Sequence, residues 1–591
     1  MAVGGWSERL APDVLRTWRR FPLAVPLQVL ATLVALAVIN DWLSSRDEFW
    51  ARAFGGLATG AAFSVAGNLF AESRLDRRRL GLVLAYVVPL AVVALCQVRD
   101  STNFVPYLLP VISIFWMSVA GFLRIGKGVD AAAQQDRFWW LNHRAFTSAV
   151  LAVAGFVIVS IGFFAIEQSL SILFGLRTGD VFEKGVLPVA GLLLAPVYWL
   201  ATLPRLDEYE PGSLVEPDFI SRAIGFLGQF ILAPILIAYA AILLAYAAQI
   251  ALSRQFPNGM LGWMVLGFTS SGAATWLLLH PAFLRGRLLV GFFRRAWFWM
   301  TIVPLGLFAV AVGMRIGAYG LTVERMLLVA GGVWAGALTL AFLLGRGDIR
   351  FIPGVAGLLF VVLSIGPWNL VNAPRVDQAL RLERALIEAG ASGKGGAPHW
   401  TPETADDAKG AIGYLSGEPE GRRLLARVLS RHAYDYDGVA TDTSALVASL
   451  GFPATSTGLP NAGSSSHVER AGDAPPIDLT ATPFYLGPVS CWVGADEIVG
   501  GRHFRLVAGN RLTVTGSANA TVTVDLDAWT NAQGRNTLET PTIDFDFEGR
   551  KFRIAVEAID ITGPDGAGPQ TLTYLTGSLF SAAAVPAKST P

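Results

Sequence analysis

Two pairs of aspartates near the C-terminus have a spacing at which two carboxylates can share one divalent cation. They are Asp525-Leu526-Asp527 and Asp544-Phe545-Asp546, and metal-dependent sugar transferases use pairs of this form. Both pairs fall in stretches where apolar and polar residues alternate, so their carboxylates are expected on the hydrated face of a strand. We therefore expect both pairs to be structural and not catalytic.

A third acidic motif, Asp435-Tyr436-Asp437-Gly438, resembles the start of a calcium-binding loop but lacks the glutamate at the twelfth position that would bind the ion with both oxygens. The two cysteines, Cys96 and Cys491, are too few for a multi-thiolate metal centre, and the sequence leaves open whether they form one bridge. The sequence also contains no phosphate-binding loop, no Gly-x-Ser-x-Gly and no His-Glu-x-x-His. It therefore indicates no cofactor and argues against an enzyme.

Polar side chains inside apolar stretches are the next candidates, because an ionisable group within a bilayer is costly and often marks a transport pathway. The residues of this kind are Gln28, Asn68, Glu167, Gln229, the run Thr269-Ser270-Ser271 and His280. Glu167 and His280 lie near the ends of their stretches, where water can reach them, which favours an interfacial structural role. A proton-coupled transporter usually buries a carboxylate in the middle of a span, and the sequence has none.

The segment Ala318–Arg325, with the sequence AYGLTVER, places an acid and a base side by side between two very apolar stretches. In a structural interpretation, Arg315 and Arg325 extend to lipid headgroups and Tyr319 anchors the loop at the membrane interface. Glu324 then lies in the first turn of the next span, capped by the preceding threonine, where the helix dipole favours a negative charge.

A functional interpretation makes this segment an outer gate or a docking site for the C-terminal region. Glu324 could pair with Arg381 or Arg384, and Arg325 with Glu383 or Glu388, because these partners belong to a charged helix predicted just after the apolar part of the chain. Exposed pairs of this kind contribute about 0–1 kcal/mol each, so they could orient a domain but not hold it alone.

The composition predicts the elements that carry these residues. Hydrophobic residues make up 53% of the chain and charged residues 15%, well below the roughly 25% of a soluble domain, so the partner of most of the chain is a lipid bilayer. The net charge of +1, with basic residues confined to short loops, argues against a nucleic-acid partner. About eleven stretches are long enough to cross a hydrocarbon core of roughly 30 Å. They are 21–40, 52–71, 80–97, 104–123, 145–166, 186–204, 223–249, 260–282, 297–314, 326–345 and 351–371.

Prolines and glycines within these stretches predict how the helices pack. Prolines should kink the helices, and the carbonyl groups that they free should be satisfied by neighbouring helices. The pairs Gly56-xxx-Gly60 and Gly332-xxx-Gly336 should allow two helices to approach closely. The prolines concerned are Pro89, Pro106, Pro110, Pro196, Pro234, Pro304 and Pro353.

The distribution of basic residues predicts the orientation. About twenty Lys and Arg lie in the segments that are inside when the N-terminus is cytoplasmic, against about eight in the other loops. The first stretch meets no small-residue cleavage site, so it should remain as an anchor and not be removed as a signal peptide. An odd number of spans places the chain after residue 371 in the periplasm, whereas one span more or fewer would place it in the cytoplasm.

Beyond residue 371 the chain changes character. From 376 to 389, apolar residues recur at helical spacing with Arg and Glu opposite them, which predicts an amphipathic helix. Two more helices are predicted, one after Thr401-Pro402 and one over 420–432. The predicted apolar stripe of the first helix consists of Ala379, Leu380, Leu382, Leu386 and Ile387.

A stretch rich in Gly, Pro and Ser follows, and after it the periodicity changes to two, which predicts a small antiparallel β-module with a tight turn at Glu548-Gly549. The predicted strands are 503–515, 521–526, 542–547, 551–557 and 572–575. The predicted organisation is a cytoplasmic N-terminus (1–20), a transmembrane bundle (21–371), an extramembrane helical segment (372–450), a linker (451–476), a β-rich module (477–582) and a disordered tail (583–591).

Three segments of the chain resemble a known family: Tyr319–Arg325 (YGLTVER), Ala195–Pro204 (APVYWLATLP) and Gly366–Leu386 (GPWNLVNAPRVDQALRLERAL). They are similar to the bacterial multi-pass family catalogued as domain of unknown function 4153, over roughly residues 15–450. The resemblance implies a bacterial inner-membrane protein and brings no activity, substrate or catalytic residue.

These features predict an α-helical polytopic membrane protein with a C-terminal extramembrane α+β region that ends in a small antiparallel β-module. The leading hypothesis for its function is a non-catalytic inner-membrane accessory or scaffold protein with a periplasmic domain that binds a protein or an envelope component. The alternative is a secondary transporter or channel for a small solute, which should show a continuous polar cavity between its helices.

Overall fold

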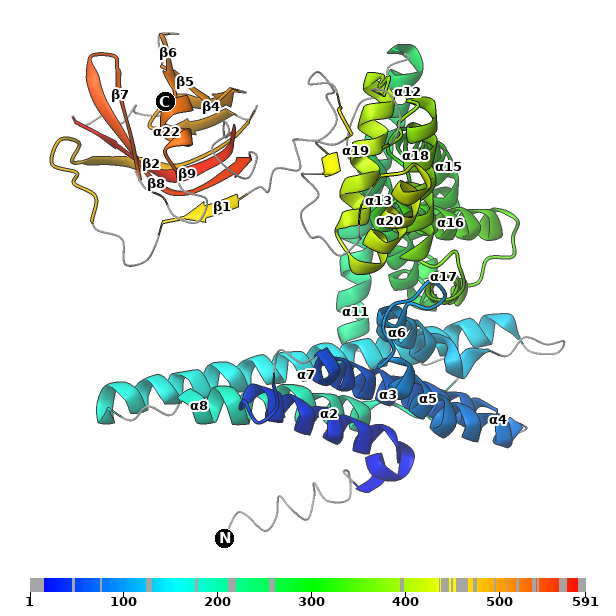
Figure 1. The fold of residues 1–591 in the computed structure, drawn as a ribbon. Coiled ribbons are helices and arrows are strands. Elements are labelled where there is room, and N and C mark those ends of the chain that lie inside the picture. The colour runs from blue at the N-terminus through cyan, green and yellow to red at the C-terminus, as the bar shows by residue number, and fades with distance from the viewer. Residues whose placement is uncertain are drawn as a thin grey trace. The chain divides into compact units, whose positions relative to one another are not determined.

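The computed structural model divides the chain into two compact units, Met1–Val376 and Asp377–Pro591 (Figure 1). The described residues are 15–44, 48–74, 77–123, 130–175, 179–210, 219–253, 261–393, 398–434, 436, 446–447, 450–452, 466–470, 476–493, 496–507, 509–516, 520–533, 538, 541–562 and 571–582. Asp435, Asp437 and Gly438 of the third acidic motif and the predicted tail at 583–591 therefore lie outside the described residues.

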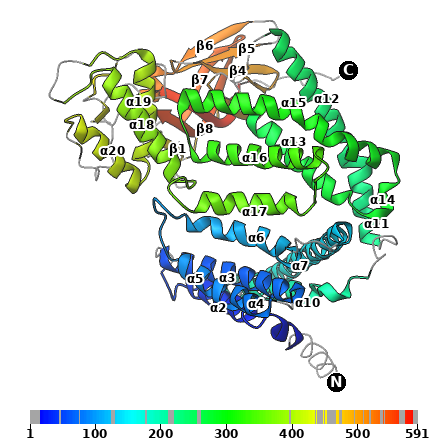
Figure 2. The ribbon, with the colours of Figure 1, turned by 90° about the vertical axis from the view of Figure 1, so that its right-hand side faces the viewer.

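The first unit is a bundle of helices. Within it α6 lies beside α17, and α15 runs alongside α16 (Figure 2). The helices are α2 (Ala24–Ile39), α3 (Glu48–Ser73), α4 (Arg78–Leu82), α5 (Val88–Leu95), α6 (Leu109–Val119), α7 (Ala131–Phe174), α8 (Gly179–Val181), α9 (Leu187–Val189), α10 (Ala195–Thr202), α11 (Phe219–Phe226), α12 (Ala233–Ser253), α13 (Leu261–Leu278), α14 (Ala282–Arg285), α15 (Leu288–Tyr319), α16 (Val323–Leu343) and α17 (Phe351–Ser364). Four π-helical turns, η2 (Val83–Val87), η5 (Phe182–Val186), η6 (Ala190–Leu194) and η8 (Leu227–Leu232), and three 3₁₀ turns, η3 (Pro106–Leu108), η4 (Ala120–Phe122) and η7 (Leu206–Glu208), interrupt or extend them.

Six helices in the described chain are long and apolar enough to cross a membrane, which confirms the membrane class of this unit. They are Glu48–Ser73, Ala131–Phe174, Gly179–Thr202, Phe219–Ser253, Leu288–Tyr319 and Val323–Leu343. Four shorter apolar helices are Ala24–Ile39, Arg79–Leu95, Pro106–Phe122 and Phe351–Ser364. Every predicted stretch falls on a helix, but the predicted count of about eleven spans is not confirmed, because several of these helices are shorter than a full crossing requires.

Prolines inside these helices leave carbonyl groups without their usual partner, because proline offers no N–H to the carbonyl four residues earlier. Pro89 follows the π-helical turn η2 and frees the carbonyl of Ala85. The hydroxyl of Ser64, on the neighbouring helix α3, donates a hydrogen bond to that oxygen at 2.9 Å. The predicted compensation by a neighbouring helix is therefore confirmed at this site.

The same compensation joins α2 to η6. Pro196 frees the carbonyl of Leu192, and two side chains of α2 reach it. Gln28 Nε2 donates to Leu192 O at 2.7 Å, and Thr32 Oγ1 donates to the same oxygen at 3.1 Å. Polar side chains of α2 thus donate hydrogen bonds to a backbone oxygen that lies in an apolar environment.

A third case lies about two turns away on the same pair of helical segments. Pro188 frees the carbonyl of Lys184 in η5, and Asn40 Nδ2, at the C-terminal end of α2, donates to it at 3.0 Å. Each of these three contacts fixes a kinked helix against one particular neighbour.

The first predicted glycine pair forms a close helix contact. A Cβ at Gly60 would lie 2.5 Å from Val93 Cγ2, and one at Gly56 would lie 3.2 Å from Val93 O, so α3 can approach α5 only without side chains here. In the second pair Gly332 lies against the ring of a phenylalanine on α15, whereas Gly336 has no atom within 4 Å of its ideal Cβ. The second pair is therefore a close contact at one glycine only.

The second unit begins with the three predicted helices. The hydroxyl of Thr401 caps the second of them by accepting a hydrogen bond from Thr404 N at 3.1 Å. Leu382 and Leu386 are completely buried, but Leu380 and Ile387 are 51% and 64% exposed, so the predicted apolar stripe was too broad. The helices are α18 (Asn372–Glu388), α19 (Pro402–Ser416) and α20 (Pro419–Arg431).

The rest of the second unit is a β-sandwich, in agreement with the predicted antiparallel β-module. One sheet has the strand order β1-β8-β9-β2, with β7 also paired to β8, and the other has the order β3-β4-β5-β6. Side chains from both sheets form one core. The strands are β1 (Ser466–Glu469), β2 (Phe484–Trp492), β3 (Asp496–Val499), β4 (Arg502–Val507), β5 (Arg511–Thr515), β6 (Thr521–Asp525), β7 (Thr542–Phe547), β8 (Arg550–Thr562) and β9 (Thr571–Ser581), and a short helix, α22 (Asp527–Asn531), follows β6.

Turn chemistry explains where the strands agree with the prediction and where they differ. The turn between β7 and β8 is confirmed, since Glu548 and Gly549 have φ angles of 52° and 71°, the signature of a two-residue type I′ turn. The stretch 503–515 was expected as one strand but is a hairpin of β4 and β5, because Gly509 and Asn510 also have positive φ angles. Strand β1 lies inside the range expected to be a linker.

Candidate functional site

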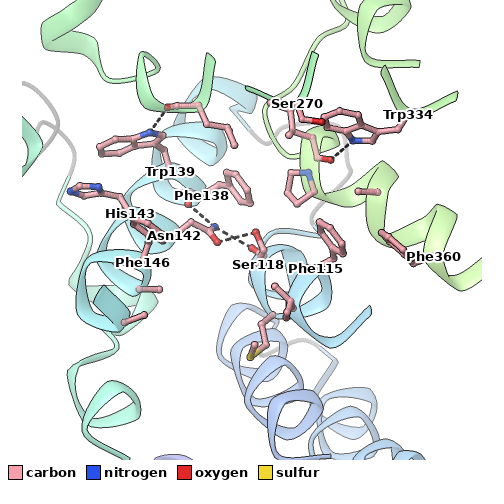
Figure 3. A pocket seen from close by; sticks show the side chains of 18 of the residues that line it. Phe115, Ser118, Phe138, Trp139, Asn142, His143, Phe146, Ser270, Trp334 and Phe360 are labelled. Atoms are coloured by element: carbon pink, nitrogen blue, oxygen red, sulfur yellow. Dashed lines mark hydrogen bonds between the residues drawn. The ribbon is translucent and has the colours of Figure 1, made fainter. Parts of the chain in front are cut away.

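A cavity of about 830 Å³ lies between α6, α7, α13, α16 and α17 of the bundle (Figure 3). Among the described residues that line it, none is Asp, Glu, Lys or Arg. On α17 the lining extends from Ile352 to Leu363, which corresponds to about 17 Å at the helical rise of 1.5 Å per residue. The lining includes Phe115, Ser118, Phe138, Trp139, Asn142, His143, Phe146, Ser270, Trp334 and Phe360.

The cavity contains few polar groups, and two of them bind each other. Ser118 Oγ donates to Asn142 Oδ1 at 2.9 Å, and Asn142 Nδ2 donates to the backbone oxygens of Phe138 and Ser118 at 2.9 and 3.2 Å (Figure 3). This pair therefore joins α6 to α7 at the wall of the cavity and offers little free hydrogen-bonding capacity to a polar ligand.

The indole groups of the lining are also satisfied by backbone. Trp139 Nε1 donates to Leu277 O at 2.6 Å, and Trp334 Nε1 donates to Ile352 O at 2.8 Å. His143 stacks on the Trp139 ring with a centroid distance of 4.5 Å, and its Nε2 lies 3.1 Å from Ser221 Oγ. The tryptophans thus present ring surface to the cavity while their N–H groups point to carbonyl oxygens.

The cavity is continuous with the outer surface of the bundle. Ile114, Phe146 and Trp263 line it, yet 61%, 64% and 50% of these residues is exposed. Exposed apolar side chains on membrane-crossing helices face the hydrocarbon of the bilayer. The lining is therefore reached from the lipid side of the bundle.

A cluster of charged side chains holds α7 to the segment after α13. His280 Nε2 lies 2.8 Å from Asp136 Oδ1, and Arg285 Nη2 donates to the same carboxylate oxygen at 2.9 Å. His280 lies near the end of its apolar stretch, but only 4% of the residue is exposed, so it is buried within the protein. The sequence reading named His280 but missed Asp136, although the mixed polar and apolar start of α7 was a signal that this part lies at an interface.

Other partly buried ion pairs lie near further helix ends. Arg20 bonds Glu72 at 2.8 Å and also donates to the backbone oxygen of Pro204 at 3.0 Å. Arg350 bonds Asp348 at 2.6 Å. These charged groups pair with each other and form hydrogen bonds with backbone carbonyls, so their role is structural.

Three of the other predicted intramembrane residues, Asn68, Glu167 and Gln229, do not meet in one site. Asn68 Nδ2 donates back to Ser64 O at 2.8 Å, within its own helix. Glu167 lies near the C-terminal end of α7 and is half-buried. Gln229 is buried in η8, and its Oε1 finds no hydrogen-bond partner among the described residues. None of the three lines the cavity.

The segment AYGLTVER connects α15 to α16, and Thr322 and Arg325 in it form hydrogen bonds with backbone groups at the ends of these helices. Helix α15 ends at Tyr319, and Thr322 caps α16 by accepting a hydrogen bond from Arg325 N at 3.3 Å. The Arg325 guanidinium donates to Tyr319 O at 3.0 Å and lies 5.6 Å from the centre of the Tyr319 ring. Glu324 is exposed in the first turn of α16, and Arg315 is exposed one turn before the end of α15.

The proposed partners of this segment have contacts within their own unit. Arg381 Nη1 donates to Asp407 Oδ1 at 2.9 Å, which ties α18 to α19. Arg431 Nη1 donates to Glu383 Oε1 at 3.1 Å, which ties α20 to α18. Docking of these residues on Glu324 and Arg325 stays a prediction.

An aromatic surface covers the outer face of the five-stranded sheet. The rings of Trp492 and Tyr574 lie 4.1 Å apart at one end of the β2–β9 pair, and those of Tyr485 and Phe580 lie 5.5 Å apart at the other. The two ends are about 20 Å apart at the rise of a strand. Sequence reading missed this surface because Gly487 and Pro488 obscure the alternation of β2.

Small and charged residues complete this outer face. Ser490 Oγ lies 2.9 Å from Tyr574 Oη, and Arg553, directly opposite Phe580, bonds Asp544 through two hydrogen bonds of 2.6 and 2.7 Å. The hydrogen bond to Asp544 raises the pKa of Arg553. We name the face formed by Tyr485, Ser490, Trp492, Asp544, Arg553, Tyr574 and Phe580 the aromatic face.

The described part of the chain contains no arrangement of side chains that indicates a metal site or a reactive thiol. No group of three or more His, Cys, Asp or Glu is placed there to hold a metal ion. Asp544 of the second aspartate pair bonds Arg553, and Asp527 of the first pair begins α22. Cys96 and Cys491 are both buried free thiols, and burial raises the pKa of Cys491 to about 12.

Comparisons with known proteins give a family and one relative. A family model described as domain of unknown function (DUF4153) matches residues 28–389, in agreement with the resemblance seen in the sequence. The chain is similar to an uncharacterized protein of Pasteurella multocida (strain Pm70), with 27% identity over 270 residues. This match covers 43% of the chain and 43% of that relative, so the chain spans less than half of the relative's length. No solved structure matches the chain.

Proposed function

The chain belongs to the family described as domain of unknown function DUF4153, and from this premise we propose that it is a non-catalytic membrane-anchored accessory protein whose β-sandwich binds a glycan of the bacterial envelope. The observation that carries the proposal is the aromatic face of the five-stranded sheet. Trp492 and Tyr485 are 55% and 58% exposed there. Large aromatic side chains with a polar tip are favoured at binding surfaces, where one part of the ring is covered and the other stays hydrated.

The chemistry of the aromatic face favours a sugar over an apolar ligand. A pyranose ring presents C–H groups on its faces and hydroxyl groups at its edge, so it can stack on an aromatic ring while its hydroxyls bind neighbouring polar groups. The Arg553–Asp544 pair lies beside Phe580, and the Ser490 hydroxyl lies beside Tyr574, so each aromatic corner has polar partners nearby. Between the two aromatic corners the side chains of Thr576 and Ser578 are small, so they project less from the sheet than the aromatic rings do.

The location of the β-sandwich outside the cytoplasm belongs to the same proposal. It is supported by the excess of Lys and Arg in the loops that share the side of the N-terminus. A fusion of alkaline phosphatase after residue 582 should be active, and a fluorescent reporter that matures only in the cytoplasm should stay dark at the same position. An inactive phosphatase with a bright reporter would place the module in the cytoplasm and refute an envelope ligand.

Binding is tested with the full-length protein in mild detergent and insoluble peptidoglycan as the probe. We expect the protein to sediment with peptidoglycan and Trp492→Ala and Tyr485→Ala each to lose most of this retention. Ile498→Ala is the matched control, because Ile498 is 64% exposed on β3 of the other sheet. Equal retention of all three variants, or no retention of the unchanged protein, would refute the glycan proposal. Loss of a stoichiometric protein partner in Trp492→Ala would instead assign the aromatic face to a protein.

The alternative of a secondary transporter or channel draws no support from the cavity. A pathway for a polar solute needs polar or ionisable side chains along its length. The lining of the cavity among the described residues contains no Asp, Glu, Lys or Arg, its histidine, His143, stacks on Trp139 and contacts Ser221, and its Ser118–Asn142 pair is internally bonded.

A further inference from the structure

We propose that the cavity between α6, α7, α13, α16 and α17 binds one acyl chain of a phospholipid from the surrounding bilayer. This inference is independent of the glycan proposal, because it concerns the bundle and not the β-sandwich. It assigns the cavity a hydrocarbon ligand, which would make a bound lipid part of the structure of the bundle.

The lining chemistry selects hydrocarbon. Ligand pockets of roughly 300–1,000 Å³ are typical of sites that enclose a whole small molecule, and the volume of about 830 Å³ falls in this range. Phe115, Phe138 and Phe360 offer ring surface, and aliphatic side chains such as Leu359 and Leu363 fill much of the remaining wall. A chain of CH₂ groups can contact all of these without leaving a polar group unsatisfied.

Water is a poor occupant of the same space. A buried water needs two to four polar partners, and apolar cavities stay dry. The Ser118 hydroxyl and the Asn142 amide bond each other and backbone, and the indole N–H groups of Trp139 and Trp334 donate to carbonyl oxygens. These polar groups are thus engaged inside the protein.

The dimensions of the cavity fit one leaflet. The lining on α17 from Ile352 to Leu363 spans about 17 Å at the helical rise. A hydrocarbon core of about 30 Å gives each leaflet about half that thickness, which an extended acyl chain must cross. The long axis of the site therefore matches an acyl chain better than a compact solute.

The entrance of the site faces the source of the ligand. Phe146 and Ile114 belong to the lining and to the exposed apolar surface of the bundle, so a lipid chain can enter sideways from the bilayer. At the level where α7 and α11 meet through the His143–Ser221 contact, the next residues along the chain are Arg144 and Arg222, both exposed. Positive charge at that level favours a phospholipid, whose phosphate would remain at the surface.

The test uses the full-length protein in vesicles of phosphatidylethanolamine and phosphatidylglycerol that contain a trace of phospholipid with a diazirine in its acyl chain. After irradiation, peptides that carry the lipid are mapped by mass spectrometry. We expect adducts on lining residues that point inward, such as Met117 and Leu359. Ala356→Phe narrows the cavity from α17 and should cause a several-fold loss of these adducts, and Ala330→Phe should do the same from α16.

Leu358→Phe is the matched control, because Leu358 lies on α17 but is 63% exposed and does not line the cavity. It should leave the inward adducts unchanged. Size-exclusion profiles identify any variant that fails to fold, and the map of the unchanged protein decides the proposal in that case. Adducts confined to outward residues such as Leu358, or inward adducts that persist in both narrowing variants, would overturn it.

Discussion

In helix α7 the side chains of Val150, Ile158 and Phe164 are 53%, 70% and 62% exposed, whereas Phe504 and Leu512 of the β-sandwich are completely buried. The same residue types thus occupy opposite places in the two regions. The physical reason is the surrounding solvent. Exposing an apolar side chain to hydrocarbon costs no free energy, whereas exposing it to water does. Exposure of apolar residues indicates a ligand surface in the β-sandwich but only the bilayer in the bundle.

Polar side chains show the converse difference. In the bundle, Ser64 and Gln28 are directed at backbone carbonyls that prolines have freed, because nothing else in a bilayer can satisfy those oxygens. In the β-sandwich, Arg553 and Asp544 bind each other on the outer face, where water is available to both. A polar residue in the bundle is therefore a structural necessity before it is a functional candidate.

The largest effect expected from this comparison separates two phenylalanines. Phe504→Ala should destabilise the β-sandwich by about 3–5 kcal/mol, because it opens a cavity in the core, whereas Phe164→Ala on the lipid-facing surface of α7 should cost less than about 0.5 kcal/mol. The thiol of Cys491 reports the opening of the sandwich, since it is buried with a pKa of about 12 and should react with a maleimide only when the core opens. Labelling is followed in the full-length protein with Cys96→Ala as background, and equal labelling rates for the two variants would contradict the comparison.

The next effect concerns the carbonyl of Ala85. Ser64→Ala should destabilise the bundle by about 1–2 kcal/mol, because it leaves a buried oxygen without a donor. Adding Pro89→Ala restores an N–H four residues after Ala85, so the cost of Ser64→Ala should shrink in that background. The measurement is a double-mutant cycle on detergent unfolding. Additive effects would mean that Ser64 does not act through the proline.

A smaller effect is expected at the connection between α15 and α16. Arg325→Leu should cost about 0.5–1.5 kcal/mol through the lost hydrogen bonds to the end of α15, and Arg315→Leu should cost close to nothing. Hydrogen exchange of the last turn of α15 checks this, with faster exchange expected only in Arg325→Leu. Equal exchange in both variants would mean that Arg325 does not stabilise the end of α15 and serves only as a charge at the membrane interface.

The smallest effect tests whether the two units touch through this connection. Glu324→Arg should leave membrane insertion intact and raise the protease sensitivity of the second unit slightly, because an exposed ion pair contributes only about 0–1 kcal/mol. Reversal of a predicted partner by Arg384→Glu should restore part of the resistance, because Arg384 is exposed on α18. Unchanged proteolysis in Glu324→Arg would leave Glu324 as a helix-dipole partner alone.

Local chemistry made much of this fold predictable. The turn at Glu548-Gly549 and the Thr401 cap follow from residue type, because few residues adopt positive φ or accept a helix N–H. The hairpin within 503–515 was missed, because Phe504, Leu506, Leu512 and Val514 keep one phase of alternation on both sides of the turn. The aromatic face was missed for a different reason, because Pro488 made β2 resemble a loop.

The sequence by itself determined the membrane class, the family, the positions of the apolar helices and the presence of a β-module, because these depend on residues close together in the chain. Only the tertiary structure decided that Ser64 serves the carbonyl freed by Pro89, that Arg325 caps α15, and that apolar side chains of several helices line one cavity. Each of these facts joins segments through packing in three dimensions. Hydrophobic periodicity records which face of a helix is apolar, but it holds no record of which neighbour that face will meet.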